Sequence, residues 1–272
     1  MSVTTDSIVE WLRQRLAHSG ARGFVFGLSG GIDSALVSRL CQLASPGNVV
    51  GVIMPCHSDP RDEADARAVA DHFQIPTIRI DLAPPYDQFT RTLGDAVRTL
   101  PRDQFPDAHH ASEDLKAKLP MANVKPRLRM TTLYFVANTL NYMVVGTGNR
   151  SELSIGYFTK YGDGGVDLLP IGNLLKSEVR AASRELGVPE PVIEKAPSAG
   201  LWLGQTDEAE MGFSYAELEN YLTKGPQTVA PALAMRIERL MRGSEHKRAL
   251  APAPGGAESP GAPGVPGDHD DE

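Results

Sequence analysis

The sequence has few cysteines, no long apolar run and no excess of basic residues. Cysteine occurs twice among 272 residues, at Cys41 and Cys56. Two isolated cysteines exclude a disulfide framework and a Cys-x-x-Cys zinc or redox site. No run approaches the roughly 20 apolar residues of a membrane-spanning helix, and residues 1–10 lack the basic and then apolar pattern of a secretory signal. We therefore expect a cytoplasmic protein without a membrane partner.

The composition is that of a globular protein with a moderate negative charge. Apolar residues make up 41% of the chain and charged residues 22%, and the formal net charge is −7. A chain of this length buries one substantial hydrophobic core, or at most two. The negative balance argues against a protein that grips nucleic acid through its phosphates, so we expect no nucleic-acid partner.

Short apolar runs alternate with helical patterns along the first half of the chain. The apolar runs are residues 24–26, 49–54, 77–80 and 142–145. Helical patterns cover residues 7–18, 34–43, 62–73, 86–100 and 126–141, and return at 176–186 and 214–222. This alternation predicts an α/β protein, a doubly wound parallel sheet with helices on both faces. Ligands of such sheets bind beyond the carboxyl ends of the strands.

The most informative motif follows the first apolar run. It reads Gly27-Leu28-Ser29-Gly30-Gly31-Ile32-Asp33-Ser34. Glycines let backbone N–H groups approach a polyphosphate, and the helix start behind them adds partial positive charge. A standard P-loop has a lysine directly before its last hydroxyl residue, whereas this chain has Asp33 there. Because a carboxylate can hold a Mg²⁺ ion that bridges phosphate oxygens, the motif predicts a site for a nucleotide triphosphate with metal.

A second acidic motif follows the last apolar run, where Gly146-Thr147 leads within a few residues to Glu152. Magnesium on a nucleotide usually takes one or two protein carboxylates, so Asp33 and Glu152 are the candidate pair. The alternative is that Glu152 only favours the start of a short helix.

Several groups of charged residues are open to two interpretations, anion binding or plain solvation. Lys176 begins a helical pattern, where a cation is poorly placed for the helix dipole unless an anion lies nearby. Lys125, Arg127 and Arg129 precede an apolar helical face and can hold an anion. A further charged run lies at residues 245–248. The loop at residues 158–165 combines lysine, glycine, acid and aromatics, as suits a mobile element that closes over a charged, flat substrate.

Taken in this order, the motifs resemble the synthetase domain of NAD synthetases, in the ATP pyrophosphatase superfamily (adenine nucleotide alpha-hydrolase-like, a Rossmann-like fold). The matching segments are residues 29–34, Arg127-Leu128-Arg129-Met130, Gly146-Thr147 with Glu152, residues 158–165, Lys195-Ala196-Pro197-Ser198 and His246-Lys247-Arg248. The Phe-Thr-Lys-Tyr-Gly-Asp run is the most specific of them. We expect one domain over residues 1–248 and a disordered Pro/Gly/acidic tail at 249–272.

The resemblance implies a ligase that forms a C–N bond in NAD biosynthesis. Deamido-NAD attacks the α-phosphorus of ATP, ammonia attacks the resulting NAD-adenylate, and NAD, AMP and pyrophosphate are released. The implied co-substrate is ATP, and Asp33 and Glu152 would hold Mg²⁺. The implied ATP contacts are residues 27–34, Thr147, Lys176 and Ser198, and the implied deamido-NAD contacts are Arg127, Lys160, Asp167, His246 and Lys247.

The resemblance also implies a homodimer with the deamido-NAD site across its interface. Glutamine-dependent members carry an additional amidase domain, and the residues before the first helical pattern leave no room for one. We therefore expect ammonia, free or from a separate protein, as the nitrogen donor. Two alternatives stay open: another adenylating enzyme, such as a tRNA-modifying one, and a non-catalytic adenine-nucleotide sensor. The acidic balance counts against the first, and Glu152 with the lysine-bearing loop counts against the second.

Overall fold

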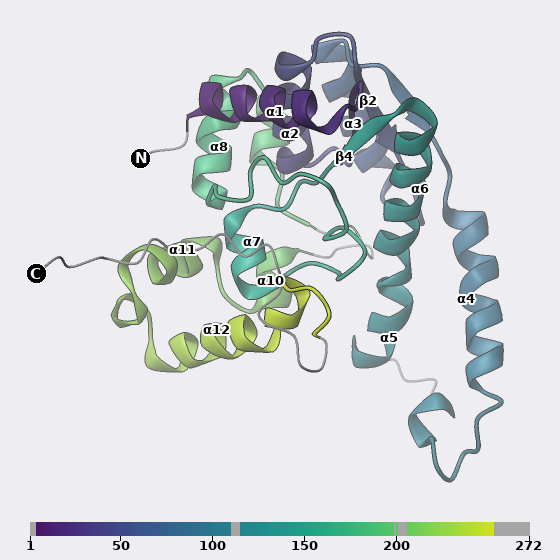
Figure 1. Cartoon of the computed structure of the whole chain (residues 1–272). Helices are drawn as coiled ribbons and strands as arrows, with labels where there is room; N and C mark the ends of the chain where they lie inside the picture. The colour runs from purple at the N-terminus through teal and green to yellow at the C-terminus, as the bar shows by residue number, and fades with distance from the viewer. Residues whose placement is uncertain (1–3, 110–114, 199, 201–205, 253–272) are drawn as a thin grey trace, which may run out of the picture.

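A four-stranded parallel sheet forms the centre of the molecule (Figure 1). The computed structural model describes residues 4–109, 115–198, 200 and 206–252. The strands are β1 (Gly23–Gly27), β2 (Val49–Ile53), β3 (Thr77–Arg79) and β4 (Tyr142–Val145). Their order is β3-β2-β1-β4, and all neighbours pair in parallel. These strands coincide with the four apolar runs of the sequence.

The strand order places a topological switch point next to β1. The chain proceeds from β1 to β2 and β3 on one side, and later returns to β4 on the other side of β1. In sheets of this kind the ligand crevice lies outside the carboxyl ends of the strands at the switch point. The helix starts that follow β1 and β4, and that carry Asp33 and Glu152, therefore lie at the same end of the sheet.

Helices cover both faces of the sheet, as predicted. Phe24 and Phe26 of β1 pack into one buried cluster with α1 (Thr5–Ser19), α2 (Ile32–Ala44), α3 (Pro60–Phe73), α8 (Lys176–Glu185) and α9 (Glu190–Glu194). Val25 points to the other face and packs into a second cluster with α6 (Val124–Leu140) and the start of α4 (Ala83–Val97). The two-residue alternation of β1 thus separates the two cores.

A third buried cluster builds a helical lobe at residues 207–243. It joins α10 (Asp207–Met211), α11 (Tyr215–Lys224) and α12 (Pro231–Gly243) to α7 (Arg150–Ile155), through side chains such as Met211, Leu218 and Ile237. In Figure 1 the lobe lies on the opposite side of the molecule from α4. The remaining elements are α5 (Leu115–Ala122) and the 3-10 helices Pro106–His109, Pro226–Thr228 and Glu245–Lys247.

The two edge strands of the sheet, β4 and β3, are protected from further strand pairing in different ways. At the β4 edge, Val144 N–H donates to Asp167 Oδ2 at 2.8 Å, and Gly146 N–H donates to the Leu168 carbonyl at 2.8 Å. At the other edge, β3 is only three residues long, and its Arg79 pairs with Glu63 of α3 at 2.9 Å. Asp167 therefore has a structural role at the sheet edge.

No helix among the described residues is long and apolar enough to cross a membrane. Both cysteines are buried free thiols. Most of the predicted disordered tail, residues 253–272, lies outside the described residues.

Candidate active site

The glycine-rich loop between β1 and α2 is held in shape by its own hydroxyl groups. Ser34 Oγ donates to the Gly31 carbonyl at 2.9 Å and lies 3.1 Å from Ser29 Oγ. Gly30 has a φ of +78°, and a Cβ there would come within 2.8 Å of Asp65 Cβ, so the loop requires glycine. No side chain caps the start of α2, which begins after Gly31. Its backbone N–H groups are thus available to an anion.

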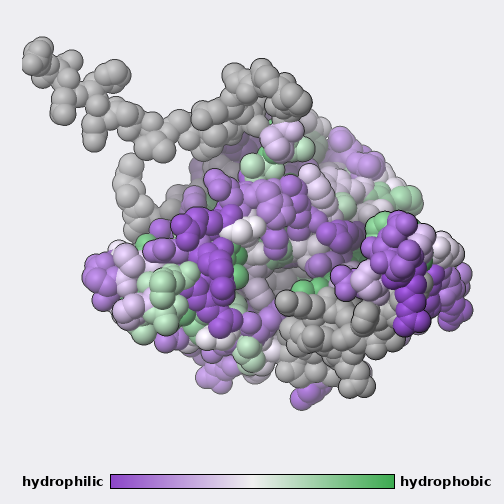
Figure 2. Space-filling view, turned by 90° about the horizontal axis from the view of Figure 1, so that it is seen from below, coloured by the Kyte–Doolittle hydropathy of each residue, from purple (hydrophilic) through white to green (hydrophobic). Residues whose placement is uncertain are grey.

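A cavity of about 530 Å³ opens beside this loop. Figure 2 shows a hollow near the middle of the face seen from below, with hydrophilic residues around much of its rim. The predicted ATP and metal residues that line the cavity are Gly27, Leu28, Ser29, Gly31, Ile32, Asp33, Ser34, Thr147, Glu152, Lys176 and Ser198. Sequence segments more than 150 residues apart therefore meet around one space. Its size suits a small-molecule site.

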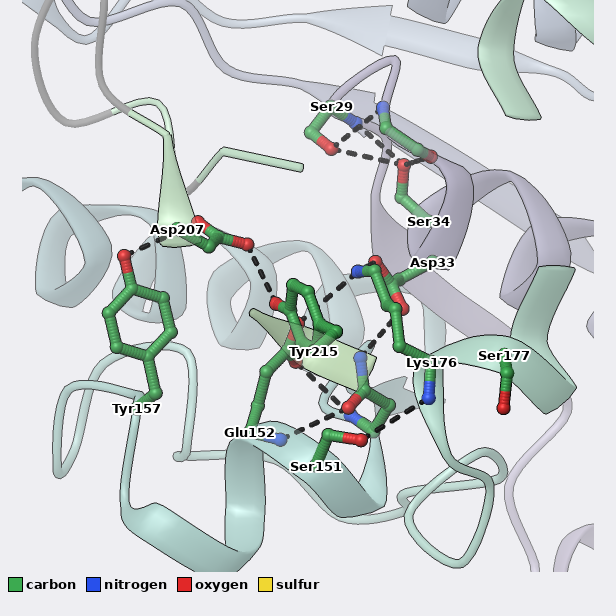
Figure 3. Close-up of polar contacts among 12 residues, drawn as sticks. Ser29, Asp33, Ser34, Ser151, Glu152, Tyr157, Lys176, Ser177, Asp207 and Tyr215 are labelled. Carbon is green, nitrogen blue, oxygen red and sulfur yellow. Dashed lines mark hydrogen bonds and ion pairs between the residues drawn. The ribbon is translucent and has the colours of Figure 1, made fainter. Parts of the chain in front are cut away.

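Lys176 lies between the two carboxylates that the sequence predicts as metal ligands (Figure 3). Its Nζ is 2.5 Å from Asp33 Oδ2 and 3.4 Å from Glu152 Oε1, and the lysine side chain is only 1% exposed. Asn149 Nδ2 donates to Asp33 Oδ1 at 3.0 Å, and the Asn149 and Glu152 side chains cap the start of α7 reciprocally. Glu152 therefore caps the start of α7, as one interpretation of the sequence predicts, and it also belongs to the charged centre.

Burial and neighbouring charge shift the acid–base behaviour of this centre. Burial raises the pKa of Glu152 to about 7; Lys176 opposes this rise, while Asp33 and Asp207 add to it. Burial works against the charged form of Lys176, but Asp33 and Glu152 outweigh it and raise the lysine pKa above its ordinary value. The lysine therefore stays charged at neutral pH, whereas Glu152 takes up a proton more readily than an ordinary glutamate.

The donor set fits a divalent cation. Asp33 Oδ2 and Glu152 Oε1 converge on one position, and the ammonium of Lys176 stands there as a cation. Paired carboxylate oxygens are the ligands that Mg²⁺ takes on a nucleotide. The sequence predicts that the Lys176 ammonium contacts a phosphate of ATP. In this structure the ammonium pairs with the carboxylates of Asp33 and Glu152, which are the nearest anionic groups.

The raised pKa of Glu152 predicts a pH-dependent metal affinity. Because a protonated carboxyl is a poor ligand, the apparent affinity for Mn²⁺, used as a Mg²⁺ substitute, should fall about tenfold between about pH 8 and about pH 6. Calorimetric titration of the metal at both pH values measures this. Glu152→Gln serves as the control and should bind more weakly with a flatter pH profile. An equally steep profile in that variant would assign the effect to another group.

The predicted deamido-NAD residues are placed in several different surroundings. Three are linked: Arg127 Nη2 donates to the Lys160 carbonyl at 3.3 Å, and Lys160 Nζ donates to the His246 carbonyl at 2.5 Å. These three do not line the cavity. Lys247 does line it, and its Nζ donates to the Gly156 and Phe158 carbonyls, both at 2.7 Å.

The loop at residues 158–165 is compact. Backbone hydrogen bonds join Gly162 N–H to the Thr159 carbonyl and Gly165 N–H to the Gly162 carbonyl, both at 2.9 Å. The Asp163 carboxylate accepts from Thr159 N–H at 2.9 Å, and Thr159 Oγ1 donates to Asn123 Oδ1 at 2.8 Å. Closure of this loop over a substrate stays a prediction.

The sequence-based prediction gave no role to several charged residues of the cavity. Lys195 Nζ binds Asp62 Oδ1 at 2.8 Å and Asp65 Oδ2 at 2.5 Å, which ties the segment before Ser198 to α3. Asp207 belongs to the lobe and lines the cavity near Glu152. Single charged residues in helical stretches carry no signal of a site until the fold brings them together.

The phosphate-type loop, the uncapped helix start and the carboxylate pair lie at the switch point of a parallel sheet. This combination defines an α/β nucleotide-binding protein. The NAD synthase family model matches residues 4–251. The chain belongs to the NAD synthase family, as its motifs predicted.

Individual relatives match over nearly the whole chain. The NH(3)-dependent NAD(+) synthetase of Carboxydothermus hydrogenoformans is 49% identical over 250 residues, which are 92% of this chain and 96% of that protein. The structure of an NMN synthetase from Francisella tularensis has a TM-score of 0.81 at 36% identity and covers 92% of this chain and 97% of its own. An NH3-dependent NAD synthetase structure from Campylobacter jejuni has a TM-score of 0.71 at 28% identity, with coverages of 92% and 96%. These matches confirm the predicted fold class.

Proposed function

We propose that this chain is an ammonia-dependent NAD synthetase. It uses ATP to activate the carboxylate of deamido-NAD as an adenylate, and ammonia then displaces AMP to give the amide of NAD. One observation carries the proposal: the loop at residues 27–34 and the Asp33–Glu152 pair line one cavity in a chain of the NAD synthase family. The same family membership disfavours a tRNA-modifying enzyme or a sensor.

The residues of the chain bind and orient the reactants, and none of them needs to form a covalent bond with a substrate. The N–H groups at the α2 start receive the phosphates that leave as pyrophosphate. Thr147 and Ser198 add hydroxyl groups at the cavity wall, and Lys176 adds positive charge beside the phosphates. Catalysis then rests on positioning and on charge neutralisation.

The charge of the cavity supports the proposal that the chain uses Mg²⁺. Among the described residues, its lining carries seven carboxylates (Asp33, Asp62, Glu63, Glu152, Asp163, Asp207 and Glu210) and four basic side chains (Arg129, Lys176, Lys195 and Lys247). Lys176 and Lys195 already pair with carboxylates. A polyphosphate is repelled by such a lining unless a divalent cation accompanies it. When bound, Mg²⁺ held by Asp33 and Glu152 would neutralise phosphate charge.

Product analysis tests the reaction directly. Purified protein with deamido-NAD, ATP, Mg²⁺ and ammonium should yield NAD, AMP and pyrophosphate in equal amounts. Glutamine in place of ammonium should give little NAD. Release of ADP, or an unchanged rate after removal of divalent ions, contradicts the proposal. ATP binding without pyrophosphate release would favour the sensor, and adenylated tRNA the tRNA-modifying enzyme.

Nicotinate mononucleotide is the second candidate substrate. The observation that favours it is the fit to the Francisella tularensis NMN synthetase, at a TM-score of 0.81 against 0.71 for the Campylobacter jejuni NAD synthetase. The two substrates share the nicotinate carboxylate, so the same activation chemistry serves both. The 49% identity to a curated NAD synthetase supports deamido-NAD as the preferred substrate. The ratio of kcat/KM for the two substrates decides between them.

We also propose that the protein acts as a homodimer in the cytoplasm and takes ammonia from solution or from a separate protein. The dimer is supported by an exposed apolar stripe on α4: Phe89, Leu93 and Val97 are 47%, 41% and 46% exposed. Their four-residue spacing puts them on one face of the helix. Figure 1 shows α4 at the outer edge of the molecule.

A charge placed in this stripe should dissociate the dimer. Leu93→Lys puts an ammonium at the centre of the apolar face, so sedimentation should show a monomer at concentrations where the unaltered protein is a dimer. Arg91→Lys on the same helix keeps its charge and is the matched control. A monomeric unaltered protein, or a dimer that tolerates Leu93→Lys, removes α4 from the interface.

A further inference from the structure

The helical lobe contacts the carboxylate centre through Tyr215 at the start of α11. Its ring is buried, with 2% exposed. Its hydroxyl lies 3.2 Å from Glu152 Oε1 and 2.8 Å from Asp207 Oδ2. The ring also faces Lys176, whose Nζ lies 5.1 Å from the ring centroid. Tyr215 thus contacts two members of the charged centre, Glu152 and Lys176, and Figure 3 shows the bond between its hydroxyl and Asp207.

A chain of hydrogen bonds fixes the far side of this tyrosine. Asp207 Oδ1 lies 3.3 Å from the Tyr157 hydroxyl, which donates to Glu210 Oε2 at 2.7 Å. Asp207 itself is 4% exposed. The Tyr215 backbone N–H donates to Glu208 Oε1 at 2.9 Å. Tyr215 therefore has both its hydroxyl and its backbone held by α10.

The two oxygens of the Glu152 carboxylate are held by different partners. Oε2 accepts from Asn149 N–H at 3.2 Å, as part of the helix cap. Oε1 faces Lys176 at 3.4 Å and Tyr215 at 3.2 Å. Rotation of the carboxyl about its last bond is thus opposed at one oxygen by the cap and at the other by Lys176 and the phenol. The oriented oxygen is the one that converges with Asp33 Oδ2.

We propose that Tyr215 is a positioning residue that orients the Glu152 carboxylate toward the cation shared with Asp33. In this role Tyr215 acts through Glu152. The proposal rests on the proposed metal role of Asp33 and Glu152. It makes the lobe at residues 207–243 part of the metal site, although the lobe lies outside the nucleotide-binding sheet.

Tyr215→Phe tests the proposal because it keeps the ring in the apolar cluster and removes only the hydroxyl. Removing a group that orients a metal ligand typically costs 10- to 100-fold in affinity, so Mn²⁺ affinity should fall about tenfold. The apparent Mg²⁺ requirement for turnover should rise by about the same factor, while kcat at saturating Mg²⁺ stays within about threefold. Mn²⁺ binding is followed by calorimetry in the presence of a non-hydrolysable ATP analogue.

Tyr221→Phe is the matched control, since Tyr221 is on the same helix and its hydroxyl bonds Glu238 at 3.4 Å, away from the cavity. Tyr157→Phe removes a hydroxyl one step further from Glu152. We expect the loss of metal affinity to decrease from Tyr215→Phe through Tyr157→Phe to none in Tyr221→Phe. An equal loss in all three would mean that the lobe acts only through its packing, and would overturn the proposal.

Asp33→Asn separates this proposal from the metal assignment on which it rests. If Asp33→Asn loses Mn²⁺ affinity and Tyr215→Phe does not, the metal site stands and the positioning role is wrong. If neither variant changes the affinity, the metal assignment itself is wrong, and the positioning role with it. If Tyr215→Phe does not yield folded protein, Tyr157→Phe is compared with Tyr221→Phe instead. Equal metal affinities in these two variants overturn the proposal.

Discussion

Replacement of Asp33 by asparagine should abolish most turnover in a protein that still folds, because Lys176 keeps Glu152 as an ion-pair partner. Asparagine keeps the side-chain volume and an oxygen that still accepts from Asn149 Nδ2, which lies 3.0 Å from Asp33 Oδ1. It removes the negative charge that faces Lys176 at 2.5 Å and that we propose as a Mg²⁺ ligand. Because the substituted centre no longer supplies a charged ligand at the phosphates, kcat should fall by at least about 100-fold.

The measurement is the steady-state rate of pyrophosphate release, with far-ultraviolet circular dichroism to verify folding. Asp95→Asn is the control, because Asp95 is an exposed aspartate of α4 that pairs with Arg98 on the surface at 3.2 Å. It should behave like the unaltered protein. Turnover of Asp33→Asn within about threefold of that of the control would show that Asp33 is not a metal ligand.

Replacement of Lys176 by methionine should have a comparably large effect, chiefly on stability. The lysine is 1% exposed and is the cation between Asp33 and Glu152. Removing one partner of a buried ion pair leaves uncompensated charge and typically costs about 3–5 kcal/mol. The free energy of unfolding of the metal-free variant should therefore fall by about this amount at pH 8.

The dependence of this destabilisation on pH and on Mg²⁺ distinguishes uncompensated charge from lost packing. The Glu152 pKa is raised from 4.5 to about 7, so the folded protein holds this proton more tightly than the unfolded chain. Glu152 therefore favours folding in acid, and that contribution is lost as the pH rises through about 7. In Lys176→Met the destabilisation should be smaller at about pH 5.5 than at about pH 8, and Mg²⁺ should reduce it at the higher pH.

Denaturant unfolding at both pH values, with and without Mg²⁺, measures these effects. Lys224→Met is the control, since Lys224 is an exposed lysine at the end of α11 that bonds Asn220. A loss of stability in Lys176→Met that ignores both pH and Mg²⁺ would indicate a packing defect.

The parallel sheet could be predicted from the sequence because its strands are short apolar runs with helical patterns between them. Val25 and Val144 lie in buried, aligned strands, which the continuous apolar character of both runs indicates. Most of the long helices are also predicted, although α2 begins at Ile32, because Gly31 provides the helix cap. The sequence patterns do not predict α5, α9, α10 or α12, and they leave α7 open as a short helix at Glu152. Segments of five residues, such as α9 and α10, are too short to show a helical period.

The candidate site likewise has a part that the local sequence predicts and a part that it does not predict. The loop at residues 27–34 carries a local signal, since glycines and Asp33 stand together in the sequence. Local sequence gives no such signal for Tyr215, whose contact with Glu152 joins residues 63 positions apart. The pairing of Lys176 with Asp33 spans 143 positions. Contacts of this range depend on the packing of the lobe and of α8, which a single sequence does not specify.

The two edges of the sheet bear on how the protein behaves at high concentration. An open strand edge is a template on which another chain can add a strand and start an aggregate. Here the β4 edge is occupied by Asp167 and Leu168 of the same chain, and β3 is short and bears the charged Arg79. Neither edge presents a long, flat, apolar ladder, so edge-to-edge growth into fibrils is disfavoured. A protein built in this way should remain dispersed when it is concentrated for crystallisation.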